Sequence, residues 1–131
     1  MVIVVGYYPA APGRAALARA LEEARLRSAR LVVVNSSRGD APVDTRFAQG
    51  HEAESLETAL KASGVDWQLQ QPVRGHDAAE EILRTAGETR ADLIVIGIRH
   101  RTPVGKLIMG SNAQRVILGA HCPVLSVRAT D

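Results

Sequence analysis

The chain has 131 residues, 46% of them hydrophobic, which is enough to bury the core of one domain. The 16 basic and 14 acidic residues give a formal net charge of +2, and only four residues are aromatic. Single-stranded nucleic acid is bound by aromatic side chains interleaved with positive charge, so this composition argues against a nucleic-acid-binding protein.

The sequence contains one cysteine and no long apolar run. Cys122 has no partner for a disulfide or a metal cage, so we expect it to fill space before a strand. The apolar start from Val2 to Tyr7 follows no basic residues, and it predicts a strand instead of a signal peptide. Because no apolar run approaches the length of a membrane span, we expect a cytoplasmic protein that has no contact with a membrane.

The first half of the chain alternates apolar runs with helical patterns. Val2 to Tyr7 is unbroken by polar residues, which is typical of a strand buried on both faces of a parallel sheet. Apolar residues then recur at helical spacing and predict a helix from Pro12 to Ser28. A second strand is predicted at Leu31 to Val34, a polar loop at Ser36 to Gly50 and a second helix at His51 to Ala62.

The alternation continues in the second half. Val65 to Val73 alternates apolar and polar residues and contains Pro72, which predicts a half-exposed edge strand. A third helix is predicted to begin near His76 and Asp77, where we expect helix capping and no catalysis. Leu93 to Ile96 is predicted to be the fourth buried strand.

A loop from Gly97 to Gly110 precedes the last helix and strand. Ser111 is predicted to cap this helix, with Val116 and Ile117 on its inner face, and Pro123 to Arg128 is the fifth strand. Strands that alternate with helices indicate an α/β fold, an open parallel sheet with helices on both faces. With no internal repeat and no dividing linker, residues 1–131 are expected to form one domain.

The remaining ionisable residues are assigned structural roles. Asp92 precedes the fourth strand and is expected to pair with a nearby donor. The glutamates on the predicted helices have the pattern of solvated helix faces with arginines nearby: Glu22, Glu23, Glu80 and Glu81. His51 and His121 have no neighbours at the spacing of metal ligands, so no metal site is predicted. No spacing indicates a Ser-His-Asp or Cys-His arrangement, so no catalytic residue is predicted.

The loop before the last helix carries the clearest ligand signal. Open parallel sheets bind ligands beyond the carboxyl ends of their strands. Gly110, Ser111 and Asn112 open the last helix there, and the N–H groups of a helix start form an anion site. The alternative is that Ser111 is only a cap and Gly110 only a turn.

Two common phosphate-binding motifs are absent. A P-loop requires glycine where His100 stands, and Ser or Thr where Leu107 follows Lys106. The dinucleotide fingerprint GxGxxG does not occur either.

The C-terminal third resembles the signature of the universal stress proteins. The matching segments are DLIVIG at 92–97 and GSNAQRVILGAHCPVLSVR at 110–128. The family pattern is Gly, two residues, Gly, nine residues, then Gly-Ser or Gly-Thr. Gly97, Gly110 and Ser111 match it, and His100 replaces the second glycine. The segment 4–21 is similar to the family's first strand, loop and helix, so the resemblance covers nearly the whole chain.

The resemblance implies a Rossmann-like sheet of five parallel strands in the order 3-2-1-4-5, often dimeric through the last strand. In members that bind ATP, backbone like that at Gly97, Gly110 and Ser111 holds the phosphates. The adenine lies near the end of the second strand, here Val34 and Asn35, and an aspartate after the first strand holds the ribose.

The chain departs from this pattern in two loops. Tyr8 and Pro9 begin the segment that replaces the usual Asp-Gly-Ser, which removes the ribose carboxylate and one N–H donor. Tyr8 can stack on a base or fill the pocket. His100 adds bulk, whereas Arg99 and Arg101 supply charge for phosphates or belong to a solvated loop. The predicted contact residues are Tyr7, Tyr8, Pro9, Val34, Asn35, Gly97, Arg99, His100, Gly110, Ser111 and Asn112.

The last strand is short, apolar and predicted at a sheet edge. Such an edge favours pairing with a second copy across a twofold axis. Val124, Leu125 and Val127 are the predicted dimer contacts, and the alternative is that a loop covers this edge.

The sequence supports three hypotheses about function. The first is a stress-response regulator that binds ATP, ADP, AMP or cyclic AMP between the first and fourth strands, with Mg²⁺ left open, and that acts through its dimer or an unidentified protein partner. The second is a dimeric regulator of the same fold that binds no nucleotide. The third, a slow ATPase, ranks last because no catalytic base or metal carboxylate is evident beside Gly110.

Overall fold

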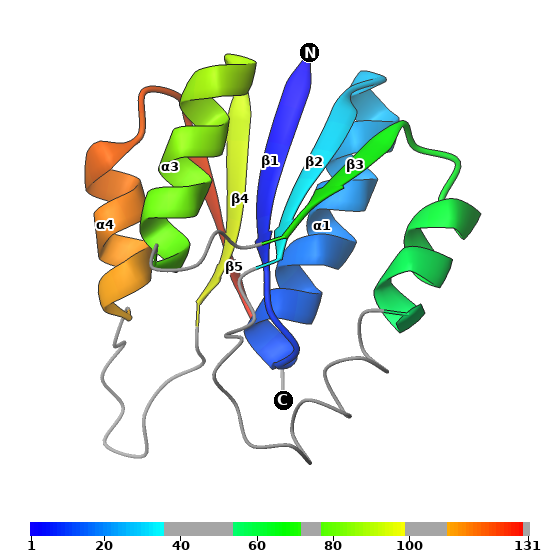
Figure 1. Cartoon of the computed structure of the whole chain (residues 1–131), viewed down its shortest axis with the longest axis horizontal. Coiled ribbons are helices and arrows are strands. Elements are labelled where there is room, and N and C mark those ends of the chain that lie inside the picture. The colour runs from blue at the N-terminus through cyan, green and yellow to red at the C-terminus, as the bar shows by residue number, and fades with distance from the viewer. Residues whose placement is uncertain (36–53, 72–76, 99–109, 130–131) are drawn as a thin grey trace.

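A computed structural model describes residues 1–35, 54–71, 77–98 and 110–129 (Figure 1). Five parallel strands form one sheet in the order β3-β2-β1-β4-β5, as the family resemblance implied. The strands are β1 (Val2–Tyr7), β2 (Arg30–Asn35), β3 (Trp67–Gln70), β4 (Leu93–Ile98) and β5 (Val124–Arg128). The helices are α1 (Ala11–Arg27), a helix over residues 54–62, α3 (Ala78–Thr89) and α4 (Ser111–Gly119).

Successive residues of β1 point into two cores on opposite faces of the sheet. Ile3 and Val5 pack in the core that includes α1 and the helix over 54–62. Val4 packs in the other core, with Ile82 of α3 and Val116 of α4. Burial on both faces explains why the central strands are unbroken apolar runs. Because all strands are parallel, their carboxyl ends meet at one edge of the sheet, where α1, α3 and α4 begin (Figure 1).

The predicted strands and helices are confirmed within the described residues, with changes at their ends, whereas the loop predicted at Ser36 to Gly50, the helix start at His51 and the strand end at Pro72 and Val73 lie outside those residues. Gly64 follows the helix over 54–62 with a φ of 76°, the left-handed conformation expected of a glycine just after a helix end. Strand β3 lies at the sheet edge and is half-buried, but it covers only Trp67–Gln70. Gly97, predicted in a loop, belongs to β4, because β5 pairs alongside it as far as Arg128.

Three side chains lie differently from their predicted positions. Glu23 and Glu81 are buried, because arginines on their own helices pair with them and compensate the charge. Ile117 was predicted to face inward on α4 but is exposed, and Val116 is the residue of this helix that is buried. The predicted role of Asp92 is confirmed, since its carboxylate accepts the N–H of Val2 at 2.8 Å.

Candidate functional site

The sheet opens between β1 and β4 at its carboxyl edge. The pairing of these two strands stops at Val5 and Val95. On the outer sides, β1 pairs with β2 and β4 pairs with β5 to the last residue of each strand. The ends of β1 and β4 therefore part at the point where the winding of the sheet reverses, which is where open parallel sheets bind ligands.

The start of α1 lies against β4 on one side of this opening. A Cβ atom at Gly97 would lie 2.0 Å from the carbonyl oxygen of Pro12, and one at Gly13 would lie 2.0 Å from the carbonyl oxygen of Tyr8. Ala10 donates its N–H to the same Tyr8 oxygen at 2.8 Å, which tightens the turn between β1 and α1. Gly97 thus has a packing role that the sequence did not indicate.

The start of α4 lies at the same edge of the sheet and is exposed. Gly110 is the N-cap residue, with φ −64° and ψ 156°, and Ser111 is the first helical residue, so the predicted capping role of Ser111 is wrong. Among the described residues, no side chain caps the helix, and a Cβ atom at Gly110 would meet no described atom within 4 Å. Gly110, Ser111 and Asn112 are all exposed, whereas Arg99 and His100 lie outside the described residues.

The predicted contact residues near β1 and β2 divide into buried and accessible ones. Tyr7 is 4% exposed and packs in the core beneath α1, and Val34 is fully buried in the other core. Asn35 is also buried, at the last position of β2. Tyr8 and Pro9 are half-buried in the turn before α1. Tyr7 and Val34 therefore direct their side chains into the protein, and Tyr8 is the accessible aromatic residue that follows β1.

The comparisons with known proteins decide the family. Residues 1–128 match the sequence model of the Universal stress protein family. The chain belongs to the universal stress protein family. A universal stress protein of Mycolicibacterium smegmatis is 50% identical over 127 residues, which cover 97% of each chain.

Solved structures of universal stress proteins share the fold over nearly the whole chain. One from Archaeoglobus fulgidus has a TM-score of 0.78 and 34% identity, covering 97% of this chain and 98% of its own. Another from Archaeoglobus fulgidus, in complex with dAMP, has a TM-score of 0.70 and 28% identity and covers 97% of both chains. A universal stress protein in complex with cAMP has a TM-score of 0.70 and 26% identity, covering 99% of this chain and 98% of its own.

An ion-pair cluster joins α3 to α4 at the same edge of this universal stress protein. Asp77 caps α3, as predicted, by accepting the N–H of Glu80 at 2.8 Å. Its other carboxylate oxygen pairs with Arg115 of α4, which also lies 3.6 Å from the Glu80 carboxylate. The hydrogen bond and charge of Asp77 raise the pKa of Arg115. Sequence reasoning missed Arg115, because its contact with Asp77 spans 38 residues.

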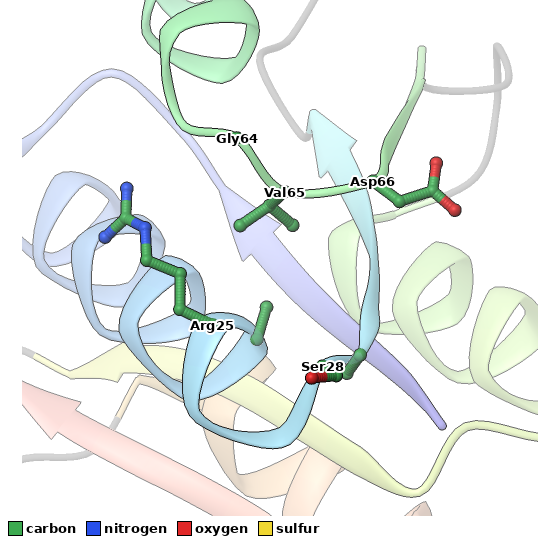
Figure 2. Close-up of a pocket in the computed structure, with 7 residues that line it drawn as sticks. Arg25, Ser28, Gly64, Val65 and Asp66 are labelled. Atoms are coloured by element: carbon green, nitrogen blue, oxygen red, sulfur yellow. The ribbon is translucent and has the colours of Figure 1, made fainter.

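A separate pocket of about 360 Å³ lies at the opposite edge of the sheet, where the strands begin. It lies between the end of α1 and residues 64–66, before β3 (Figure 2). Figure 2 shows Val65 pointing toward the end of α1 and the Asp66 carboxylate pointing away from Arg25. Arg25 instead donates to the carbonyl oxygen of Ser63 at 3.3 Å. These polar groups do not converge on one point, as those of a small-molecule site usually do.

Other chemistry is limited in the part of the chain that the structure describes. There, no three His, Cys, Asp or Glu side chains come together as metal ligands, and no helix is long and apolar enough to cross a membrane. Cys122 packs against the core beneath α3 and α4, which fits its predicted role as a filler. Burial, and then the Asp92 carboxylate, raise the pKa of the Cys122 thiol, which disfavours the reactive thiolate.

Proposed function

We propose that this universal stress protein is a regulatory protein that binds an adenine nucleotide at the carboxyl ends of β1 and β4. The observation that carries the proposal is the opening between these strands, with the exposed start of α4 at the same edge. Relatives of 28% and 26% identity in complex with dAMP and cAMP support an adenine nucleotide as the ligand.

The start of α4 is where we place the phosphate. The first N–H groups of a helix have no partner within it, and the helix dipole favours an anion at this end. Gly110 has no side chain to hinder the approach of a phosphate, and the Ser111 hydroxyl adds a further donor. No described side chain caps the helix in competition with the ligand.

The ribose end of the site differs from the family pattern. Tyr8 stands where the resemblance places the ribose carboxylate, and Pro9 brings no N–H. We therefore expect modest affinity, with a dissociation constant of about 10 μM, which corresponds to about −7 kcal/mol. AMP and cyclic AMP require fewer phosphate contacts than ATP and are the ligands we favour.

The test is isothermal titration calorimetry of ligand-free protein with AMP, ADP, ATP and cyclic AMP, with and without Mg²⁺. Gly110→Asp places a carboxylate where the phosphate would bind, whereas Gly110→Asn places a neutral group of similar size there. Both residues are good N-caps, and a Cβ atom would meet no described atom within 4 Å, so both variants should fold. We expect Gly110→Asp to abolish binding and Gly110→Asn to weaken it less. Binding unchanged in Gly110→Asp would contradict the placement of the phosphate.

The partner that we propose is a second copy of the chain, paired at the outer edge of β5. In the ladder between β4 and β5, Ile94 donates its N–H to the carbonyl oxygen of Pro123 at 3.0 Å, and Ala129 donates to that of Ile98 at 3.2 Å. Backbone groups alternate in direction along a strand, so the N–H and C=O of Ser126 face away from β4. These outward groups are what an added strand would pair with.

The proposed dimer contacts are three residues of β5. Val124, Leu125 and Val127 are only partly buried, although each packs against a core of the single chain. Because β5 is an edge strand, pairing of two copies across a twofold axis would complete their burial.

A dimeric regulator that binds no nucleotide is the second candidate function. The observation that favours it is the contact of Pro12 with Gly97, which closes one side of the opening, together with Tyr8 and Pro9 in the turn before α1. This candidate predicts no heat with any nucleotide from protein that is folded and dimeric in sedimentation.

A further inference from the structure

The cluster of Asp77, Glu80 and Arg115 places two negative charges and one positive charge beside the start of α4. Asp77 and Glu80 belong to the first turn of α3, and Arg115 is their partner from the neighbouring helix. All three side chains are between 41% and 52% exposed, so their charges act on a ligand through water as well as on each other.

Arg115 lies one helical turn after Ser111. Residues four apart are neighbours on a helix surface, and helical side chains lean toward the N-terminus. The guanidinium therefore lies toward the end of α4 at which Gly110 and Ser111 are exposed. The α3 and α4 starts lie at the same edge of the sheet (Figure 1), so the two carboxylates lie at this end as well.

We propose that Arg115 is a positioning and specificity residue that neutralises Asp77 and Glu80 beside the nucleotide phosphates. This inference rests on the proposed nucleotide site. It identifies the residue that determines whether that site accepts nucleotides with one, two or three phosphates. Without the positive charge of Arg115, the two carboxylates would repel the ligand more strongly, and the repulsion would grow with the number of phosphates. The ion pair thus lets the site accept a di- or triphosphate as well as a monophosphate.

Coulomb's law gives the size of the effect. AMP carries about two negative charges and ATP about four at neutral pH. For an assumed separation of about 8 Å between the guanidinium and the phosphates, and about 10 mM salt, Coulomb's law predicts that loss of the charge weakens AMP binding about fourfold and ATP binding about fifteenfold. At about 150 mM salt, screening reduces these losses to about twofold and about fourfold.

Four variants test the role of the charge: Arg115→Gln, Arg115→Lys, Asp77→Asn and the double variant Asp77→Asn with Arg115→Gln. Asparagine still caps a helix, so Asp77→Asn removes charge without removing the cap. Arg27→Gln is the matched control. Arg27 also pairs with a glutamate, and its side chain is 49% exposed against 47% for Arg115. It differs in lying at the end of α1, at the opposite edge of the sheet. The dissociation constants of AMP and ATP are measured by calorimetry at both salt concentrations.

We expect Arg115→Gln to weaken ATP more than AMP, with the difference shrinking at high salt. Arg115→Lys and the double variant should restore the ratio of the two constants to near that of the unaltered protein, and Arg27→Gln should leave it unchanged. Equal losses for both nucleotides, or no loss, in Arg115→Gln would overturn this inference while the proposed function stands. An unaltered protein that binds neither nucleotide would overturn the proposed function and this inference together.

Discussion

Replacing Gly97 with alanine should strain the junction between β4 and the start of α1. The new Cβ atom would lie 2.0 Å from the carbonyl oxygen of Pro12 and 2.5 Å from its carbonyl carbon. Both obstacles are backbone atoms, so no side-chain rotation can relieve the contact. To reach ordinary contact at 3.4 Å, the first turn of α1 must retreat from β4 by about 1.4 Å.

This retreat sets the expected loss of stability. Added methyl groups in well-packed sites typically cost about 1–3 kcal/mol, and we expect about 3 kcal/mol because the obstacle is backbone. Gly13 packs as tightly on Tyr8, so the turn before α1 cannot absorb the shift locally. With a urea dependence of about 2 kcal/mol per molar, the unfolding midpoint should fall by about 1.5 M.

Urea unfolding followed by circular dichroism measures this change. Gly110→Asn is the control, since a Cβ atom there meets no described atom within 4 Å and asparagine is a good N-cap, so its free energy of unfolding should fall by less than about 0.5 kcal/mol. If Gly97→Ala unfolds within about 0.5 kcal/mol of the unaltered protein, the reasoning from the Pro12 contact is refuted.

Two further predictions concern the pH dependence of stability and the dimer. The hydrogen bond from Arg27, and the nearby charge of Arg19, lower the pKa of Glu23 against the opposing effect of burial. Its contribution to stability is therefore complete above the ordinary glutamate pKa of about 4.3 and is lost as the pH falls through the lowered folded value. Glu23→Gln should flatten the loss of stability in acid, measured by urea midpoints from pH 3 to 7, and an unchanged acid limb would exclude this role. Ser126→Pro removes an N–H that faces away from β4, so sedimentation should show a folded monomer. Val127→Pro removes an N–H that faces β4, so this control variant should unfold. A dimer that survives Ser126→Pro would exclude pairing through β5.

Much of the fold could be predicted because burial on both faces of a sheet leaves a clear pattern in the sequence. The apolar runs at Val2–Tyr7 and Leu93–Ile96 are typical of strands that helices cover on both sides, and the strand order came from the family resemblance. The ends of strands were harder to predict from the sequence. Gly97 belongs to β4 because β5 pairs with it, and this pairing leaves no local pattern. A glycine at that position indicates a loop when pairing is not known.

The candidate site was predicted less completely, for a physical reason. The two glycines at its edge have different roles that the sequence cannot separate. Gly97 makes room for the Pro12 backbone, whereas a Cβ atom at Gly110 would meet no described atom within 4 Å. Tyr7 looked like a ligand contact because it ends β1, but its side chain belongs to the core beneath α1. Arg115 pairs with Asp77, and a pairing across 38 residues leaves no local pattern.

The measurement that tests the central claim most directly is a titration of ¹⁵N-labelled protein with AMP, followed by the backbone amide signals. The account predicts saturable shifts at Ser111 and Asn112, where the phosphate would meet the start of α4, and none at Gly64 or Asp66 beside the pocket at the opposite edge. Shifts centred on that pocket, or no shifts with any adenine nucleotide, would contradict a nucleotide site at the carboxyl ends of β1 and β4.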